Sequence, residues 1–234
     1  MGDAKSSRRQ IGARGRWARR LFLVLVLTGL AGVGYYLVGF AQSSDEFNLT
    51  TVRLEGLKVL TEEEVLVASG VSSGDSVLQL DRARIKAGIE TLSYVESADV
   101  TLVFPDTMVV RVVERAPVAT LIVRNAAFEL DRAGVVLRRY AEGRIFMTPL
   151  ITQVGDIDVV DVGDQLQSPA LLDALQAWDA LTDTGIPATL TLSEIAARST
   201  DEILMFFDEV PFEIRWGRGD VRDQAQRLKV LWDE

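Results

Sequence analysis

The hydrophobic pattern begins with one long apolar stretch. No charged residue occurs between Arg20 and Asp45, and Leu21–Ala41 is almost wholly apolar. At a rise of about 1.5 Å per residue, a helix over this stretch is roughly 31 Å long, close to the thickness of the hydrocarbon core of a bilayer. Because lipid offers no water to the backbone, a segment that crosses it must be helical. The pattern therefore predicts a single transmembrane helix over residues 21–41.

Charge on either side of this stretch indicates its orientation. Residues 1–20 carry seven basic side chains and one acidic side chain, whereas Asp45 and Glu46 follow the stretch. By the positive-inside rule, we expect a cytoplasmic N-terminus and extracytoplasmic residues after about 42. A cleaved signal peptide, with Gly39-Phe40-Ala41 as its cleavage site, is the alternative. The apolar region of a signal peptide has only about 7–15 residues, which favours a retained anchor here.

The next block begins with a strand and a helix. Residues 52–55 alternate between apolar and polar side chains, which is typical of a strand, and Gly56 ends them. Thr61 and Glu64 have the spacing of a capping box, so we expect a helix that begins there and stops at Gly70. The apolar residues of the following loop, which we expect to enter the core, are Val77, Leu78 and Leu80.

A second helix and a hairpin complete this block. The helix runs from Asp81, as its cap, to about Leu92, with apolar residues along one face. Residues 99–104 then alternate, 105–107 form a turn, and 108–114 return as a second strand. The order strand, helix, helix, hairpin predicts a compact α+β module.

The second block is rich in strand patterns and contains two helices. Residues 128–137 alternate around the tight turn 131–134, which predicts a hairpin. Ser168 followed by Pro169 is typical of a helix start, and Gly185 lies just beyond the expected end. The remaining expected elements are strands at 149–151, 190–196, 203–207 and 212–216, and a helix from Asp220 through Leu228.

Composition excludes several classes of chemistry. Of the 234 residues, 48% are apolar and 25% are charged, which is typical of folded domains. The chain has no His and no Cys, which excludes Ser-His-Asp and Cys-His sites, Cys/His zinc sites, haem ligation through His, and disulfides. The formal charge is −9, of which residues 1–20 contribute +6, so the rest carries −15. Because phosphate binding needs a basic face, we expect no nucleic-acid partner.

Motifs that suggest binding chemistry have simpler explanations. The densest carboxylate cluster, between residues 156 and 164, lacks the acid and the glycine that a calcium loop needs at its fifth and sixth positions. Arg218-Gly219-Asp220 is the tripeptide of adhesion ligands, but we expect Asp220 to cap the following helix. No nucleotide-binding glycine loop is present. We therefore expect no catalytic residue, no cofactor and no metal site. The clustered acids are Asp156, Asp158, Asp161 and Asp164.

Four strings of the first block stand out together. They are Gly74-Asp75-Ser76-Val77-Leu78, Tyr94-Val95, Phe104-Pro105-Asp106 and the run Val-Val-Glu-Arg-Ala-Pro-Val-Ala at 112–119. With the order of elements, they resemble the POTRA domain of the FtsQ/DivIB family of bacterial division proteins. The last string is the most specific, because in that family a strand ends in Glu-x-x-Pro and runs directly into the next domain. The resemblance extends over about residues 15–232.

The resemblance implies an α+β protein with one N-terminal transmembrane helix, a POTRA domain of β-α-α-β-β order, and a β-rich domain with two helices. The expected parts are a basic cytoplasmic tail at 1–20, the transmembrane helix at 21–41, the POTRA domain at 47–116 and an FtsQ-type β domain at 117–234. The family usually adds one or more strands after the final helix. We therefore expect the β domain to lack its final strand or strands, and to leave an unpaired sheet edge.

The function that the resemblance implies is that of a non-enzymatic scaffold in the divisome. Such a protein lies in the inner membrane, is enriched at the division septum, and links cytoplasmic ring-associated components to periplasmic synthesis of septal peptidoglycan. The partners implied are FtsB, FtsL, FtsK and FtsW/FtsI-like proteins, with lipid around the single span and no small-molecule substrate. Partner strands would add to an open sheet edge.

Two alternatives remain beside this function. One is a POTRA-type receptor or chaperone of a secretion or outer-membrane assembly apparatus, for which the chain after Pro117 is too short to add a barrel. The other is an anchored periplasmic hydrolase, which would need converging carboxylates with separated pKa values.

The residues that we expect to bind partners belong to predicted strands and to the turn after the last strand. Because neighbours on a strand point to opposite faces, one of Phe206 and Phe207 must point away from the core. The full set is Val100, Leu102, Phe206, Phe207, Phe212, Trp216 and Arg218.

Overall fold

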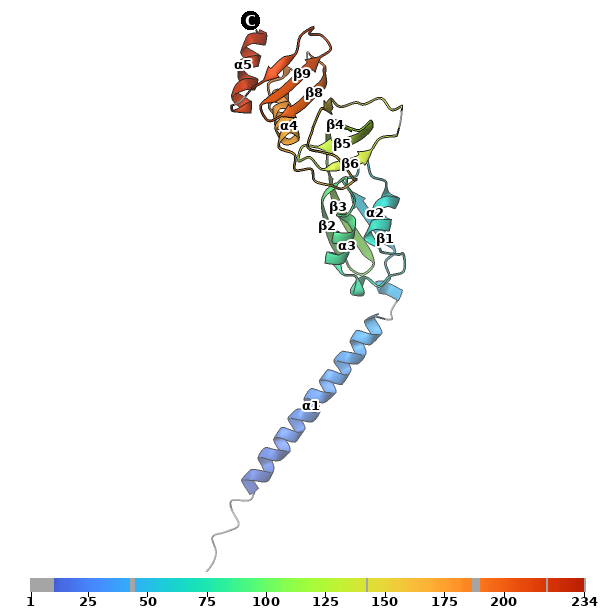
Figure 1. The fold of residues 1–234 in the computed structure, drawn as a ribbon. Coiled ribbons are helices and arrows are strands. Elements are labelled where there is room, and N and C mark those ends of the chain that lie inside the picture. The colour runs from blue at the N-terminus through green and yellow to red at the C-terminus, as the bar shows by residue number, and fades with distance from the viewer. Residues whose placement is uncertain (1–10, 43–44, 142, 187–189, 218, 234) are drawn as a thin grey trace, which may run out of the picture. The chain divides into compact units, whose positions relative to one another are not determined.

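The computed structural model describes residues 11–42, 45–141, 143–186, 190–217 and 219–233 (Figure 1). These residues form two compact units. The first contains the N-terminal helix with residues 45–53, 72–81 and 102–108, and the second contains residues 54–71, 82–101 and the chain from 109 onward. Helices and strands are mixed along the chain, which confirms the predicted α+β class.

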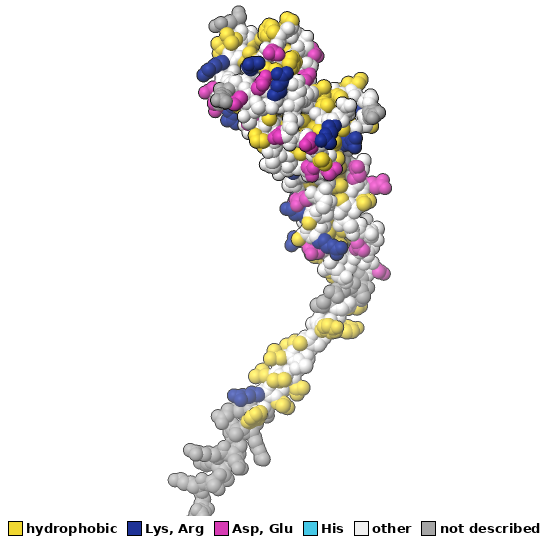
Figure 2. Space-filling view, viewed as in Figure 1, with side chains coloured by type: hydrophobic (Ala, Val, Ile, Leu, Met, Phe, Trp, Pro, Cys, Tyr) yellow, Lys and Arg dark blue, Asp and Glu magenta, His cyan; other side chains and the backbone are white. Residues whose placement is uncertain are grey.

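The N-terminal helix α1 (Ile11–Gln42) contains the predicted membrane segment. Within it, Arg19–Tyr36 is long and apolar enough to cross a bilayer. The side chains of this stretch are all exposed, and Figure 2 shows them as mainly hydrophobic. The hydroxyl of Thr28 donates to the carbonyl of Val24 at 2.8 Å, so this polar group needs no water. A helix that is apolar on every face suits lipid as its surroundings.

The first sheet has three strands in the order β1-β3-β2. The capping box is confirmed, because the amide of Glu64 donates to the Thr61 hydroxyl at 3.3 Å and the amide of Thr61 donates to the Glu64 carboxylate at 2.8 Å. Gly70 ends the helix in the left-handed conformation, with φ of 65°. The elements are η1 (Asp45–Phe47), β1 (Thr51–Glu55), α2 (Glu62–Ser69), η2 (Val77–Gln79), α3 (Arg82–Ile89), β2 (Val95–Val103) and β3 (Thr107–Glu114).

The prediction for the loop before α3 is wrong at one position. Val77 is buried, but Leu78 is 39% exposed. The cause is the 3-10 helix η2, in which successive side chains point about 120° apart, so that adjacent apolar residues cannot all face the core. Strand β2 also starts earlier than the predicted 99–104, at Val95.

The second sheet has seven strands in the order β10-β9-β8-β7-β4-β5-β6. Strand β7 is parallel to both of its neighbours, whereas the other described pairs are antiparallel. Strand β4 was not predicted, because its apolar run does not alternate. The strands are β4 (Pro117–Val123), β5 (Ala126–Asp131), β6 (Val136–Arg139), β7 (Leu150–Thr152), β8 (Leu192–Ser199), β9 (Glu202–Phe207) and β10 (Ile214–Trp216).

Two helices accompany the second sheet. Helix α4 (Pro169–Thr182) packs on β8, and α5 (Val221–Asp233) packs against α4. The predicted cap of α4 is confirmed, because the Ser168 hydroxyl accepts the amide of Leu171 at 3.2 Å and donates to Asp156 at 2.7 Å. The core between α4 and the sheet includes Leu171, Leu175, Leu181, Ile195 and Met205.

One buried carboxylate joins β5 to the residue that precedes β2. Glu129 is 3% exposed and accepts hydrogen bonds from the hydroxyls of Tyr94 and Tyr140, the latter at 2.6 Å. It also pairs with Arg138 at 2.9 Å. Burial, and then the hydrogen bond to Glu129, raise the pKa of Tyr94. Both carboxylate oxygens of Glu129 therefore accept hydrogen bonds, and this network stabilises the packing of β5 in the second unit.

Candidate functional site

The seven-stranded sheet ends at β10, which presents an open edge. Strand β10 pairs with β9, with Arg215 opposite Leu204, and no described strand pairs with its other side. The predicted unpaired edge is therefore present in the part of the chain that the structure describes. An edge strand offers N–H and C=O groups to an incoming strand, so this edge is the candidate docking site.

A hydrogen-bonded turn fixes the end of β10. The amide of Gly217 donates to Gln224 Oε1 at 2.9 Å, and Gln224 Nε2 donates to the Gly217 carbonyl at 2.9 Å. Asp220 Oδ1 accepts the amides of Arg222 and Asp223 at 2.9 and 3.1 Å, which confirms that Asp220 caps α5. The edge strand is thus held against the first turn of α5.

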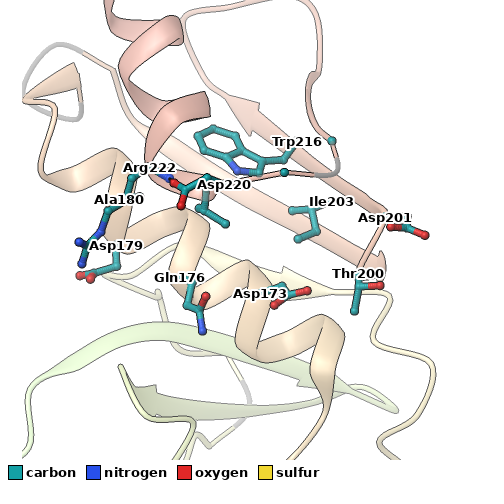
Figure 3. A pocket seen from close by; sticks show the side chains of 13 residues that line it. Asp173, Gln176, Asp179, Ala180, Thr200, Asp201, Ile203, Trp216, Asp220 and Arg222 are labelled. Atoms are coloured by element: carbon teal, nitrogen blue, oxygen red, sulfur yellow. The ribbon is translucent and has the colours of Figure 1, made fainter.

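A cavity of about 660 Å³ lies beside this turn, between α4, α5 and the ends of β9 and β10 (Figure 3). Asp179 on its wall pairs with Arg132 at 2.7 Å. Because aspartates outnumber the single arginine, the wall is negatively charged and suits polar or cationic groups of a partner. The charged residues of the wall are Asp173, Asp179, Asp201, Asp220 and Arg222.

Trp216 contributes the only indole to this cavity's described wall. Its side chain is 3% exposed, and its N–H has no hydrogen-bond partner among the residues described. Because the nitrogen itself is buried, an acceptor in the cavity does not reach it in this arrangement of the wall. The accessible chemistry of the cavity is therefore that of its acidic wall.

The edge strand carries a charged side chain. Arg215 lies 4.0 Å from Glu202, which also pairs with Arg198 at 3.0 Å. Exposed ion pairs contribute little to stability. Charged residues on an edge strand instead discourage indiscriminate pairing, so Arg215 can select among incoming strands.

The loop between β9 and β10 is tied to the start of β8. The Glu209 carboxylate accepts the amide and the hydroxyl of Thr191, both at 2.8 Å. Two hydrogen bonds lower the pKa of Glu209: the larger effect comes from the Thr191 amide and the smaller from the Thr191 hydroxyl. Phe212, in the same loop, is 64% exposed beside the edge.

The structure divides the predicted partner-binding residues by their burial. Phe207 on β9 points toward the core and Phe206 points away from it, which agrees with the expectation that one of these two neighbours faces outward. A partner could contact the buried residues of this set only through their backbone or, for Trp216, through the cavity that it lines. The role of these residues in partner binding stays a prediction. Val100, Phe207 and Trp216 are buried, Leu102 and Phe206 are half-buried, Phe212 is exposed, and Arg218 lies outside the described residues.

Two features near this edge were not predicted. The last turn of α5 exposes Val230, Leu231 and Trp232, and the apolar pattern of a helix does not reveal whether its end is covered. The cavity is built from α4, the β8–β9 turn, β10 and α5, which are far apart in the chain. No local pattern could have brought them together.

Three of the four clustered carboxylates, those of Asp156, Asp158 and Asp164, have partners nearby. Asp158 pairs with Arg124 at 2.6 Å, and Asp164 accepts the amide of Asp161 at 2.9 Å. Among the described residues, no group of three or more acidic side chains is placed to hold a metal ion.

Comparisons with known proteins match both folded blocks. Residues 47–115 match the family model described as "POTRA domain, FtsQ-type", and residues 119–234 match "Cell division protein FtsQ/DivIB, C-terminal". The chain is 30% identical over 219 residues to the cell division protein FtsQ of Anaeromyxobacter sp. (strain K), covering 92% of this chain and 74% of that protein.

Two further similarities concern another relative and a solved structure. The cell division protein FtsQ of Syntrophotalea carbinolica is 29% identical over 193 residues, covering 82% of this chain and 67% of that protein. The structure of the major extracytoplasmic domain of the trans isomer of the division protein DivIB from Geobacillus stearothermophilus is 16% identical, with a TM-score of 0.30, and covers 49% of this chain and 86% of that chain.

Proposed function

Because this chain belongs to the FtsQ/DivIB family of cell division proteins, we propose that it is a membrane-anchored scaffold of the division machinery, which holds other division proteins together and catalyses no reaction. The observation that carries this proposal is the match of both folded blocks, 47–115 and 119–234, to models of that family. The open edge at β10 supports a docking role.

We assign the parts of the chain to the two sides of the inner membrane. Residues 1–20 are the cytoplasmic tail and 21–41 are the span. The POTRA domain at 47–116 and the β domain at 117–234 then lie in the periplasm, enriched at the septum. The basic residues of the tail support this orientation by the positive-inside rule.

The partners that we propose are division proteins of the FtsB, FtsL, FtsK and FtsW/FtsI-like kinds. A partner strand adds to β10 through backbone hydrogen bonds, which carry little selectivity by themselves. Phe212 and Arg215, exposed beside and on this edge, supply side-chain contacts that distinguish one partner from another. Through such contacts the chain links cytoplasmic ring-associated components to septal peptidoglycan synthesis.

The division role is tested by depletion and complementation. Cells depleted of the protein are expected to grow into long undivided filaments, and re-expression of the chain restores division. Normal division in the absence of the protein would contradict the role.

The docking edge is tested by charge reversal. Arg215→Glu is expected to reduce co-purification of an FtsB-like partner from membranes, because the reversed charge faces any strand that adds to β10. Arg139→Glu, on the strand at the opposite edge of the same sheet, is the matched control and should leave co-purification unchanged. Equal effects of both substitutions would show that the partner does not bind at β10.

A further inference from the structure

The folded chain next to α1 forms a small tip, which we define as residues 45–53, 72–81 and 102–108. The amide of Leu49 donates to the carbonyl of Asp75 at 2.8 Å. The amide of Thr50 donates to the carbonyl of Asp106 at 3.0 Å, and its hydroxyl donates to the Asp106 carboxylate at 2.5 Å. The segment that leaves α1 is thus bonded directly to the loop that contains Asp75 and to the β2–β3 turn.

Covalent geometry keeps the tip at the membrane surface. Helix α1 ends at Gln42 and η1 begins at Asp45, so at most about 11 Å of extended chain separates them. A helix that enters hydrocarbon at Leu21 leaves it about 20 residues later, and the headgroup layer on that side adds only roughly 6 Å. Any tilt of the helix shortens this reach. Even with the linker fully extended, Asp45 lies only about 6 Å beyond the headgroup layer, so the tip begins next to the membrane surface.

Apolar side chains are exposed on this tip. Val103 is 47% exposed and Phe104 is 58% exposed at the β2–β3 turn, and Leu78 is 39% exposed in the neighbouring segment. Because the tip lies beside the bilayer, lipid is the partner that we expect to cover these side chains. Apolar and aromatic groups are stabilised at the boundary between headgroups and acyl chains. We propose that the tip is a lipid-binding surface, with Phe104 and its apolar neighbours inserted into the adjacent leaflet.

Charge on the tip defines the lipid that it fits. Asp45, Glu46 and Asp75 are exposed there, and Arg53 is the only cation on the tip. Carboxylates at the headgroup layer attract the ammonium groups of zwitterionic lipids and repel anionic lipids. The surface therefore suits a zwitterionic leaflet.

The absence of cysteine allows a direct test with single labels on the full chain. Leu78→Cys, carrying a nitroxide, reports the depth of the tip in phosphatidylcholine nanodiscs. Val113→Cys is the matched control, because Val113 is also apolar and is 53% exposed, but it lies at the end of β3 away from the β2–β3 turn. The measurement is power-saturation electron paramagnetic resonance with oxygen, which enters lipid, and with a water-soluble nickel chelate.

Lipid contact predicts a several-fold higher ratio of oxygen to nickel accessibility at the tip label than at the control label. Phe104→Ser, added to the Leu78→Cys chain, should lower that ratio, and Phe104→Leu should retain it. The proposal is overturned if the two labels have the same ratio, or if Phe104→Ser leaves the ratio unchanged. Protection of the tip label from both reagents would equally overturn it, because contact with protein excludes oxygen as well. None of these outcomes depends on the division role.

Discussion

Replacing the buried Glu129 by glutamine is expected to destabilise the second unit substantially. The carboxylate, 3% exposed, receives the hydroxyls of Tyr94 and Tyr140 and pairs with Arg138. Hydrogen bonds to charged groups contribute about 1.5–3 kcal/mol each, and removal of one partner of a buried pair costs about 3–5 kcal/mol. The Arg138 side chain is 49% exposed, so solvent screens the ion pair with Glu129 and reduces its contribution to stability. Glutamine retains one acceptor oxygen, so we expect a loss of about 2–4 kcal/mol in the free energy of unfolding.

Urea unfolding of the full chain in detergent micelles, followed by tryptophan fluorescence, measures this loss. With a slope of about 1–3 kcal/mol per molar, the unfolding midpoint should fall by roughly 1–2 M. Glu202→Gln is the matched control, because Glu202 forms an exposed ion pair with Arg198 at 3.0 Å and such pairs contribute only about 0–1 kcal/mol.

A double-mutant cycle with Tyr94→Phe separates the hydrogen bond from the charge. Both substitutions change the contact between Tyr94 and Glu129, so their effects should be less than additive by about 0.5–3 kcal/mol. Equal midpoints for Glu129→Gln and Glu202→Gln, or strict additivity with Tyr94→Phe, would refute the reasoning.

Three further predictions concern other parts of the chain. Burial raises the pKa of Glu114, but hydrogen bonds from three backbone amides lower it more, so its folded pKa lies below that of an ordinary glutamate. The stability that these bonds contribute is therefore lost as the pH falls through the lowered pKa, and Glu114→Gln should flatten the acid limb of the pH dependence in circular-dichroism melts. Gly88→Ala places a Cβ 2.3 Å from the carbonyl oxygen of Ala68 and should cost about 1–3 kcal/mol in the same melts, whereas Gly155→Ala, with open space around it, should cost little. Replacing residues 21–41 by an unrelated membrane span should preserve part of the complementing activity in depleted cells, because the span anchors the chain; complete loss with normal membrane insertion would contradict an anchoring role.

Much of the local structure could be predicted because its causes lie close together in the chain. The capping box of α2, the Ser168 cap of α4 and the Asp220 cap of α5 each join residues two to three positions apart. The membrane helix depends only on an uninterrupted apolar run. The POTRA resemblance likewise rested on short strings in a fixed order, and the family match confirms it.

Other features depended instead on contacts between distant segments of the chain. Nothing in the pattern predicted strand β4, the exposure of Leu78, or the burial of Trp216. Glu129 looked like one more acid on an alternating strand, and only packing brought Tyr94 onto it from 35 residues away.

The sequence by itself therefore determined the anchor, the helix ends and the family of this protein, because caps, turns and apolar runs act over a few neighbouring residues. Tertiary structure decided which side chains are accessible, which sheet edge stays open and where the cavity lies. These depend on how strands from separate parts of the chain pair and on which helix covers each face, and burial is a property of that assembly rather than of any single segment.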